Sequence, residues 1–299
     1  MKLKTRIIIV VLFILTALFS VTAYEIFISY HNLEIEEIII QSDKINQPVD
    51  MVLISDLHDH EFGQNNSKLI TKLQEINPDA ILMAGDMMNS TSDRPDVAVG
   101  LIQRLVKDYP VYYSLGNQEI EYMELHHSTQ LIKQLESAGV IVLEEEYEDV
   151  EVNGNLFSIG GIYDYAFEVD GAGHMSKKDM DPDLLNYLEE FQNKDNFKLM
   201  MSHRPDSFIF GEAGKTWNID LVVSGHVHGG QVVLPFLGGL WAPDQGWFPD
   251  YVAGYYKFDT LDMVITSGLG SHKEILPRFN NPPEIMVLHM VQKASVKSE

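Results

Sequence analysis

The sequence predicts an α/β protein in which layers of sheet and helix follow an N-terminal apolar helix. Three observations lead to this fold class. Short apolar runs alternate with amphipathic segments along most of the chain, the connections between them are short, and an uncharged run lies close to the N-terminus. Such alternation is typical of layered α/β domains. Because the 299 residues contain no long linker and no internal repeat, we expect one domain after the N-terminal segment.

Residues 1–24 carry the signal of a membrane-entry segment. Lys2, Lys4 and Arg6 precede an uncharged run from Ile7 to Ala23. This run is at the short limit of a spanning helix and slightly long for the core of a signal peptide, so a segment cleaved after Ala23 is the alternative. We favour a retained single-pass anchor because no Pro or Gly marks the end of the run. The positive flank then places the N-terminus in the cytoplasm and predicts a cell-membrane protein whose main domain is extracytoplasmic.

Residues 25–48 form a lead-in region with a strand predicted over 33–41, and residues 49–292 form the main domain. Elements are predicted there where an apolar run or a helical period is bounded by polar residues. In chain order they are strand 51–55, helix 67–75, strand 80–84, helix 97–107, strand 111–114, helix 123–138, strand 140–143, a hairpin of strands 147–152 and 156–160, a loop over 163–178, helix 184–191, strand 197–202, a helix after Pro205, strand 219–224, and β-rich sequence from 231 onward. The hairpin follows from Asn153-Gly154, which favours a two-residue turn.

The composition excludes several classes of protein. Asp and Glu outnumber Lys and Arg by 44 to 21, which gives a formal charge of -23 and opposes unaided binding of nucleic acid or of an anionic membrane surface. The chain has no Cys, which removes disulfides, thiolate nucleophiles and Cys-based metal sites. Any metal must therefore be held by His, Asp, Glu, Asn or Gln.

Five of the predicted strands end in polar residues that commonly bind metals. The groups are Asp56-Leu57-His58, Gly85-Asp86, Gly116-Asn117-Gln118-Glu119, His203 and Gly225-His226-Val227-His228. Ligands of an open α/β sheet bind outside the carboxyl ends of the strands, so these groups are expected to converge. Two of them, Asp56/His58 and His226/His228, contain a pair of ligand residues separated by one residue. In an extended backbone such a pair points to one side and can hold one cation. Nitrogen and oxygen donors suit Zn, Mn or Fe. Two such cations about 4 Å apart can generate a bound hydroxide and stabilise an in-line displacement at phosphorus.

These five groups, in this order, resemble the motifs of the calcineurin-like metallophosphoesterases: D-x-H, G-D, G-N-H-D/E, a single His and G-H-x-H. The resemblance covers residues 49–230, and Gly229-Gly230-Gln231 is similar to the membrane-anchored bacterial branch of the family. It implies a four-layer αββα sandwich and a site at the strand ends. It also implies two divalent cations. Their ligands would be Asp56, His58 and His228 for one cation and Asn117, His203 and His226 for the other, with Asp86 bridging both.

The sequence departs from the family pattern at Gln118, where the family usually has a His that is thought to protonate the leaving group or to stabilise the transition state. Gln does not titrate, but its amide can donate a hydrogen bond to a developing oxyanion. We therefore expect a dinuclear phosphohydrolase that cleaves phosphoester or pyrophosphate bonds by a metal-bound hydroxide, with weak acid assistance at this position. The alternative is a metal-binding, phosphate-sensing domain with little or no turnover, which only Gln118 favours.

Single residues carry little weight by themselves. An isolated His203 or His228 is more readily explained as a structural histidine, and only the shared placement of seven residues favours a metal centre. Asp59 is a candidate to orient a metal ligand or is a solvated surface residue. Four further histidines are candidates for the missing acid, although a solvated position is the default for each: His60, His126, His127 and His174.

The segment 232–247 is apolar, aromatic and rich in Gly and Pro directly after the last metal motif. It is either a buried β-meander or a membrane-facing lip, with Trp241, Trp247 and Phe248 at the interface, that admits a lipid-linked phosphate. The expected partners are thus a phosphate-ester substrate, soluble or lipid-linked, and the membrane through the N-terminal helix, with no nucleic acid. The sequence leaves the oligomeric state open.

Overall fold

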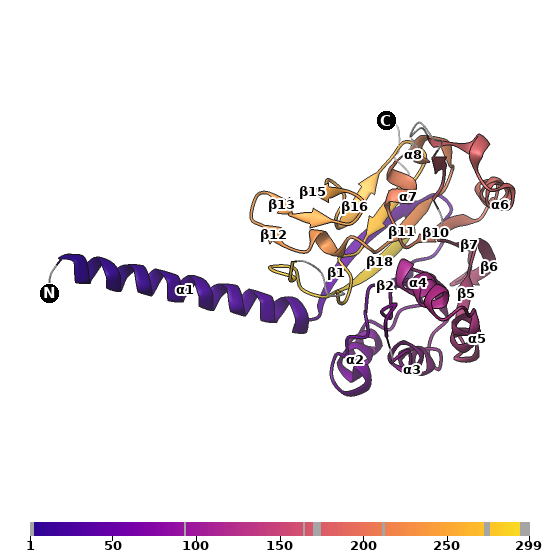
Figure 1. The fold of residues 1–299 in the computed structure, drawn as a ribbon. Coiled ribbons are helices and arrows are strands. Elements are labelled where there is room, and N and C mark those ends of the chain that lie inside the picture. The colour runs from indigo at the N-terminus through magenta and orange to yellow at the C-terminus, as the bar shows by residue number, and fades with distance from the viewer. Residues whose placement is uncertain are drawn as a thin grey trace, which may run out of the picture.

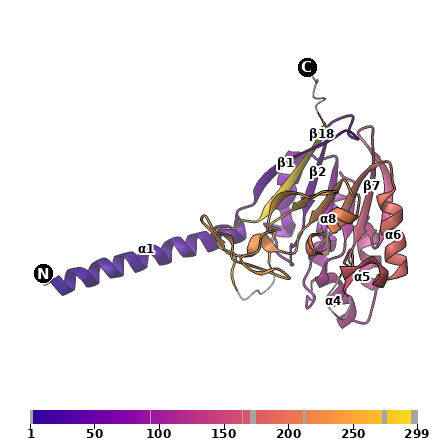
Figure 2. The ribbon, with the colours of Figure 1, turned by 90° about the horizontal axis from the view of Figure 1, so that it is seen from above.

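Two six-stranded sheets pack face to face, helices cover both outer faces, and a long helix projects from one end of this sandwich (Figures 1 and 2). The structure is a computed structural model and describes residues 3–92, 94–163, 165–169, 175–210, 213–271 and 276–293. The αββα sandwich that the motifs imply is confirmed. Its four layers follow the chain, because the first half builds most of one sheet with its helices and the second half builds the other sheet and adds one C-terminal strand to the first.

The projecting helix is α1 (Leu3–His31), which continues past the uncharged run. Its apolar side chains are exposed along most of its length, and it is long and apolar enough to cross a membrane. A signal sequence near the N-terminus has the same length and composition. Its last turn is built into the domain. Ser29 is fully buried and its hydroxyl accepts a 3.1 Å hydrogen bond from the backbone N–H of Asn281. The hydroxyl of Tyr30 accepts a 3.2 Å bond from the backbone N–H of Arg278.

The first sheet contains the strands that carry the first three metal motifs. Its strand order is β1 (Glu34–Ser42), β18 (Glu284–Gln292), β2 (Val49–Ile54), β3 (Ala80–Ala84), β4 (Val111–Ser114) and β5 (Ile141–Leu143). All neighbours are parallel except β18 and β2. The outer layer is formed by α2 (Ser67–Ile76), which follows the 3-10 turn η1 (Gln64–Asn66), α3 (Asp96–Leu105), α4 (Asn117–Leu125) and α5 (Gln130–Ser137). The predicted lead-in strand is therefore the edge strand of this sheet.

The second sheet carries the remaining two motifs. Its order is β16 (Gly254–Lys257), β17 (Asp262–Ile265), β11 (Leu221–Ser224), β10 (Phe197–Ser202), β7 (Asn155–Ile162) and β6 (Glu146–Val152). The outermost pair on each side is antiparallel and the inner strands are parallel. Its outer layer contains α6 (Pro182–Gln192) and the short helices α7 (Asp206–Ile209) and α8 (Ala213–Thr216).

Three layers of apolar side chains hold the four layers of structure together. In β2, Met51 and Leu53 point between the two sheets, whereas Val52 and Ile54 point toward the outer helices. This alternation follows from the two-residue period of a strand. Because both faces are buried, the strand reads as a continuous apolar run in the sequence. A third cluster, which includes Phe191 and Trp217, packs behind the second sheet.

Two predicted elements differ from the structure. The single helix expected over 123–138 is two helices, α4 and α5, and α4 already begins at Asn117, with Gly116 at its N-cap and Glu119 in its first turn. The loop expected over 163–178 contains the short strands β8 (Glu168–Val169) and β9 (Met175–Ser176) and the turn η2 (Lys177–Asp179). After the turn η3 (His228–Gly230), the β-rich segment forms two small hairpins. These are β12 (Val233–Leu234) with β13 (Gly238–Gly239), and β14 (Trp241–Ala242) with β15 (Gly246–Trp247).

Candidate metal centre

The loops that follow β2, β3, β10 and β11 bring six of the predicted ligands into two groups. Asp56, His58 and His228 form the first group, with donor atoms within 4.8 Å of one another. Asp86, His203 and His226 form the second group under the same limit. All six residues are buried at the ends of strands from both sheets. The convergence expected from the strand ends is therefore present.

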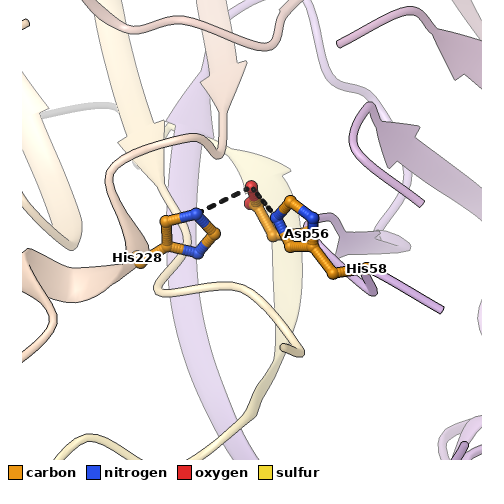
Figure 3. A group of neighbouring side chains, drawn as sticks. All are labelled: Asp56, His58 and His228. Atoms are coloured by element: carbon orange, nitrogen blue, oxygen red, sulfur yellow. Dashed lines mark ion pairs between the residues drawn. The ribbon is translucent and has the colours of Figure 1, made fainter. Parts of the chain in front are cut away.

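The first group is arranged around one carboxylate (Figure 3). Asp56 Oδ1 lies 3.8 Å from His58 Nε2 and 3.8 Å from His228 Nε2, so the two imidazoles approach it from opposite segments of the chain. The other ring nitrogen of His58, Nδ1, lies 3.0 Å from Asn89 Oδ1. Asn89 is held in turn by Asp59, whose Oδ2 accepts a 2.9 Å bond from the Asn89 amide. Asp59 thus orients the residue that orients His58.

Asp86 lies between the two groups. Its Oδ2 is 3.3 Å from His203 Nε2 in the second group and 3.8 Å from His58 Nε2 in the first. His203 is held by its opposite ring nitrogen, because Nδ1 donates a 2.7 Å hydrogen bond to the carbonyl of Ala84. The same oxygen thus faces histidines of both groups, a position from which a carboxylate can bridge neighbouring cations.

Asn117 is the first residue of α4 and precedes Gln118, whose backbone N–H bonds to Asp86 of the second group. Among the residues that the structure describes, the buried Oδ1 of Asn117 and Nε2 of His203 have no hydrogen-bond partner. An unsatisfied buried acceptor is costly, and such groups in native proteins call for an explanation such as an ion. A carbonyl oxygen, carboxylates and imidazoles are a donor set that suits Mn, Fe or Zn. The residues therefore fit a site for divalent cations.

The electrostatics of the centre favour positive charge. Burial opposes ionisation of Asp86, but His203 and His58 keep the pKa of this carboxyl below its usual value. Burial lowers the pKa of His203, yet the carboxylates of Asp86 and Asp56 outweigh it and raise this pKa to about 9. In contrast, burial lowers the pKa of His228 to about 3 although Asp56 opposes the shift, so its imidazole is neutral at pH 7 and able to bind a metal. The same carboxylates that attract a proton at His203 attract a cation.

The backbone at the ligand residues is not extended, contrary to the geometry expected for pairs one residue apart. Asp56, His58 and Asp86 have φ of 54°, 50° and 52°, and His226 and His228 have φ of 70° and 47°. This left-handed region is uncommon for residues other than glycine and clusters at functional sites. Asp56 and His58 still meet, through a tight turn. His226 and His228 lie in different groups, which is the division of these two residues that the family resemblance implies.

Two glycines allow the loops to approach so closely. A Cβ on Gly116 would overlap the carboxylate of Asp86, and a Cβ on Gly225 would overlap the side chains of Ser55 and Asp56. Each glycine belongs to a metal motif, so its place in the pattern follows from the space beside a ligand.

Sequence reasoning assigned no role to Glu119, which the structure places at the centre of a hydrogen-bond network. Its fully buried carboxylate accepts bonds of 2.8 Å from the backbone N–H groups of Asp86 and Gly116, and of 2.8 Å from the hydroxyl of Tyr113. Burial raises its pKa, and the charge of Asp86 raises it further. Glu119 therefore joins the loops after β3 and β4. The available signal was its position as the last residue of the third motif.

Gln118 lies at the start of α4 beside the second group. Its Oε1 accepts a 2.9 Å hydrogen bond from the backbone N–H of Ser90, and its own backbone N–H donates a 2.8 Å bond to Asp86 Oδ1. The carbonyl end of the amide is thereby occupied. Among the described residues none accepts a bond from the amide nitrogen, which is the end that can donate to a substrate.

Of the four other histidines considered as the missing acid, two lie in aromatic contacts outside the two groups of candidate ligands. The ring of His60 lies 4.5 Å from the ring of Phe62, and that of His126 lies 4.3 Å from the ring of Tyr122. His127 lies just beyond the end of α4 with φ of 47°. His174 lies outside the described residues.

Buried carboxylate and imidazole groups at the strand ends of an αββα sandwich define a protein of the metal-dependent phosphoesterase class. Residues 50–230 match the calcineurin-like phosphoesterase family, and the chain belongs to this family. The match spans all five motifs.

Several relatives resemble most of this chain. An uncharacterized metallophosphoesterase of Bacillus subtilis, YkuE, is 26% identical over 88% of this chain and 87% of its own length. An uncharacterized metallophosphoesterase of Campylobacter jejuni is 24% identical over 87% of this chain, and the chain spans 64% of the length of that relative. The phosphodiesterase YaeI of Escherichia coli is 27% identical over 82% of this chain and 83% of its own length. A solved structure of a Thermus thermophilus protein, TT1561, superposes with a TM-score of 0.44 at 14% identity, over 75% of this chain and 90% of that chain.

Proposed function

We propose that this protein is a membrane-tethered, dinuclear metal-dependent phosphohydrolase. The observation that carries the proposal is the pair of buried ligand groups joined by Asp86. Asp56, His58 and His228 hold one cation in this proposal. Asn117, His203 and His226 hold the other, and Asp86 binds both. The cations are Mn, Fe or Zn, which suit nitrogen and oxygen ligands.

When bound, two divalent cations supply an activated water as nucleophile and offset the negative charge of the phosphoryl group. The protein contributes position and shielding. Burial excludes bulk water from the ligands, and Glu119 fixes the loop that carries Asp86. The Gln118 amide is placed to donate a hydrogen bond to an oxygen on which charge develops. Proton transfer to the leaving group is left to solvent, because Gln118 does not titrate.

The proposed substrates are phosphodiesters or lipid-linked pyrophosphates. The similarity to the phosphodiesterase of Escherichia coli supports the first class. The long apolar helix α1 supports a place at the cell membrane with the catalytic domain outside the cytoplasm, because Lys2, Lys4 and Arg6 precede it.

The test is metal content and turnover of the full-length protein in detergent. Purified protein is loaded separately with Mn, Zn, Fe and Mg and assayed on an activated aryl phosphodiester and on the matching monoester. We expect two bound cations per chain and hydrolysis with at least one metal. Two bound cations without turnover of any ester would instead favour the phosphate-sensing alternative. Absence of metal binding would overturn both.

A further inference from the structure

Outside α1, four strongly exposed apolar side chains lie on the two small hairpins that follow the last metal motif. Phe236 is fully exposed, and Leu237, Trp247 and Phe248 are 66%, 64% and 58% exposed. We call these four residues the apolar rim. Other large apolar side chains in the described part of the domain are exposed singly or lie on an edge strand. Single exposed side chains are normal, whereas a gathered set marks an interaction surface.

The hairpins hold the rim outward. Leu237 lies in the turn between β12 and β13, where its backbone N–H donates a 3.1 Å bond to the carbonyl of Leu234. Phe248 follows β15, and its backbone N–H donates a 2.9 Å bond to the carbonyl of Leu240. Phe236 and Phe248 have φ of 68° and 54°, which bulky residues rarely adopt. Backbone bonds thus hold the chain at Leu237 and Phe248, whose side chains are both exposed.

The rim is continuous with the metal centre. The turn η3 contains the ligand His228, and β12 begins a few residues later. The β14–β15 turn returns to the centre, because Asp244 Oδ2 lies 2.9 Å from Nε2 of His226. The β14–β15 hairpin therefore touches a candidate metal ligand at its turn and carries Trp247 at its other end.

The rim also faces the side from which α1 leaves. In both views the hairpins protrude from the domain toward the base of α1 (Figures 1 and 2). Between Ala23 and the end of α1 at His31 the helix rises about 12 Å at 1.5 Å per residue. The head-group layer on each side of a bilayer is about 6 Å thick. Since Ser29 and Tyr30 are bonded to the domain, a bilayer crossed by α1 would lie within reach of the hairpins.

We propose that the apolar rim docks into the bilayer that α1 crosses and so presents the metal centre to phosphate groups of membrane lipids. Aromatic side chains favour this interface. The net charge of -23 offers no attraction to anionic lipid, so the docking is apolar. The inference rests on the proposed function and names the location of its substrate.

Tryptophan fluorescence tests the docking independently of catalysis. The chain has three tryptophans, of which Trp217 is fully buried, Trp241 is half-buried and Trp247 belongs to the rim. Full-length protein is placed in nanodiscs of phosphatidylcholine with plain or brominated acyl chains. We expect bromine to quench part of the emission, Trp247→Phe to remove most of that quenching, and the control Trp217→Phe to keep it. Quenching that is absent, or unchanged in Trp247→Phe, would overturn the proposal.

A catalytic comparison separates the docking from the proposed function. Phe236→Ser and Leu237→Ser, which alter the β12–β13 hairpin and not the hairpin that contacts His226, are assayed on a phospholipid ester in nanodiscs and on a soluble aryl phosphodiester. Loss of one apolar side chain from a lipid contact should lower turnover of the lipid ester about tenfold and leave the soluble ester unchanged. An equal loss of turnover on both substrates would contradict docking of the apolar rim into the bilayer. If the unmodified protein hydrolyses neither ester, the proposed function fails, and the quenching result still decides the docking.

Discussion

The two ligand groups of the metal centre differ in what holds them. In the first group, His58 is oriented by Asn89, whose backbone N–H and side-chain amide both donate to Asp59 and whose amide also donates to the carbonyl of His58. In the second group, the partner of His226 is Asp244, which lies in a hairpin turn and whose side chain is 35% exposed. His58 is thus braced by a half-buried loop with several hydrogen bonds, and His226 by one residue of an exposed hairpin turn.

This difference indicates that the two proposed cations would not be bound equally firmly. Partners of a metal ligand set its orientation and typically change metal affinity when they are lost. A partner fixed by three hydrogen bonds keeps its ligand in place at all times, whereas a partner on an exposed turn depends on the state of that turn. We therefore expect a cation held by His226 to respond to changes in the β14–β15 hairpin, and a cation held by His58 to be insensitive to them.

The largest effect is expected for Asp86→Asn, because this carboxylate lies between the two groups and its loss should weaken metal binding at both. Charge stabilisation by bound metals amounts to several kcal/mol, so kcat/KM on an aryl phosphodiester should fall by about 10³-fold or more. The matched control is Asp50→Asn, since Asp50 is paired with His289 on β18. Activity within tenfold of the unmodified protein would contradict a bridging role for Asp86.

A smaller effect separates the two groups. Asn89→Ala and Asp244→Ala each remove one orienting partner, and each should weaken one of the two cations by about 10–100-fold while the other stays bound. A chelator titration that follows the release of each metal measures this. Because Asp244 is exposed, we expect its variant to keep the same thermal stability. Equal weakening of both cations in both variants would mean that the groups are not independent.

The smallest effect is expected for Gln118→His at the edge of the second group. A histidine here would restore a titrating donor, and a fully tuned general acid contributes about 10²–10⁴-fold. We expect about a tenfold gain in kcat for esters with poor leaving groups and little change for activated aryl esters, measured over a series of leaving groups. An equal change on both kinds of ester would exclude proton donation at this position.

Most of the fold could be predicted because its strands are short and buried on both faces. The runs at 80–84, 111–114 and 197–202 match β3, β4 and β10. The division of helix 123–138 was missed because residues 126–129 contain neither Pro nor Gly. These four residues are exposed, and the Ser128 hydroxyl accepts a 3.1 Å bond from the backbone N–H of Gln130 at the start of α5, so a Ser is the local signal for the boundary.

The candidate ligands could also be predicted, but not how the chain holds them. The residue types at Asp56 and His226 do not predict the left-handed backbone found there, because glycine is the usual signal for such a conformation. Asn89 and Asp244 were missed because each reaches its histidine only after the loops fold together, 31 and 18 positions away along the chain. Pattern reasoning locates side chains that end strands and misses those that support them.

The bonded last turn of α1 makes the linkage between anchor and domain a stiff stalk instead of a flexible tether. Asn281, which bonds to Ser29, also supports the carbonyl of His228 with its side-chain amide. If α1 spans a bilayer as proposed, the metal centre stays at one height above the bilayer and at one tilt relative to it. Its collisions with substrate are then governed by lateral diffusion in two dimensions, and phosphates farther out toward the cell exterior are beyond its reach.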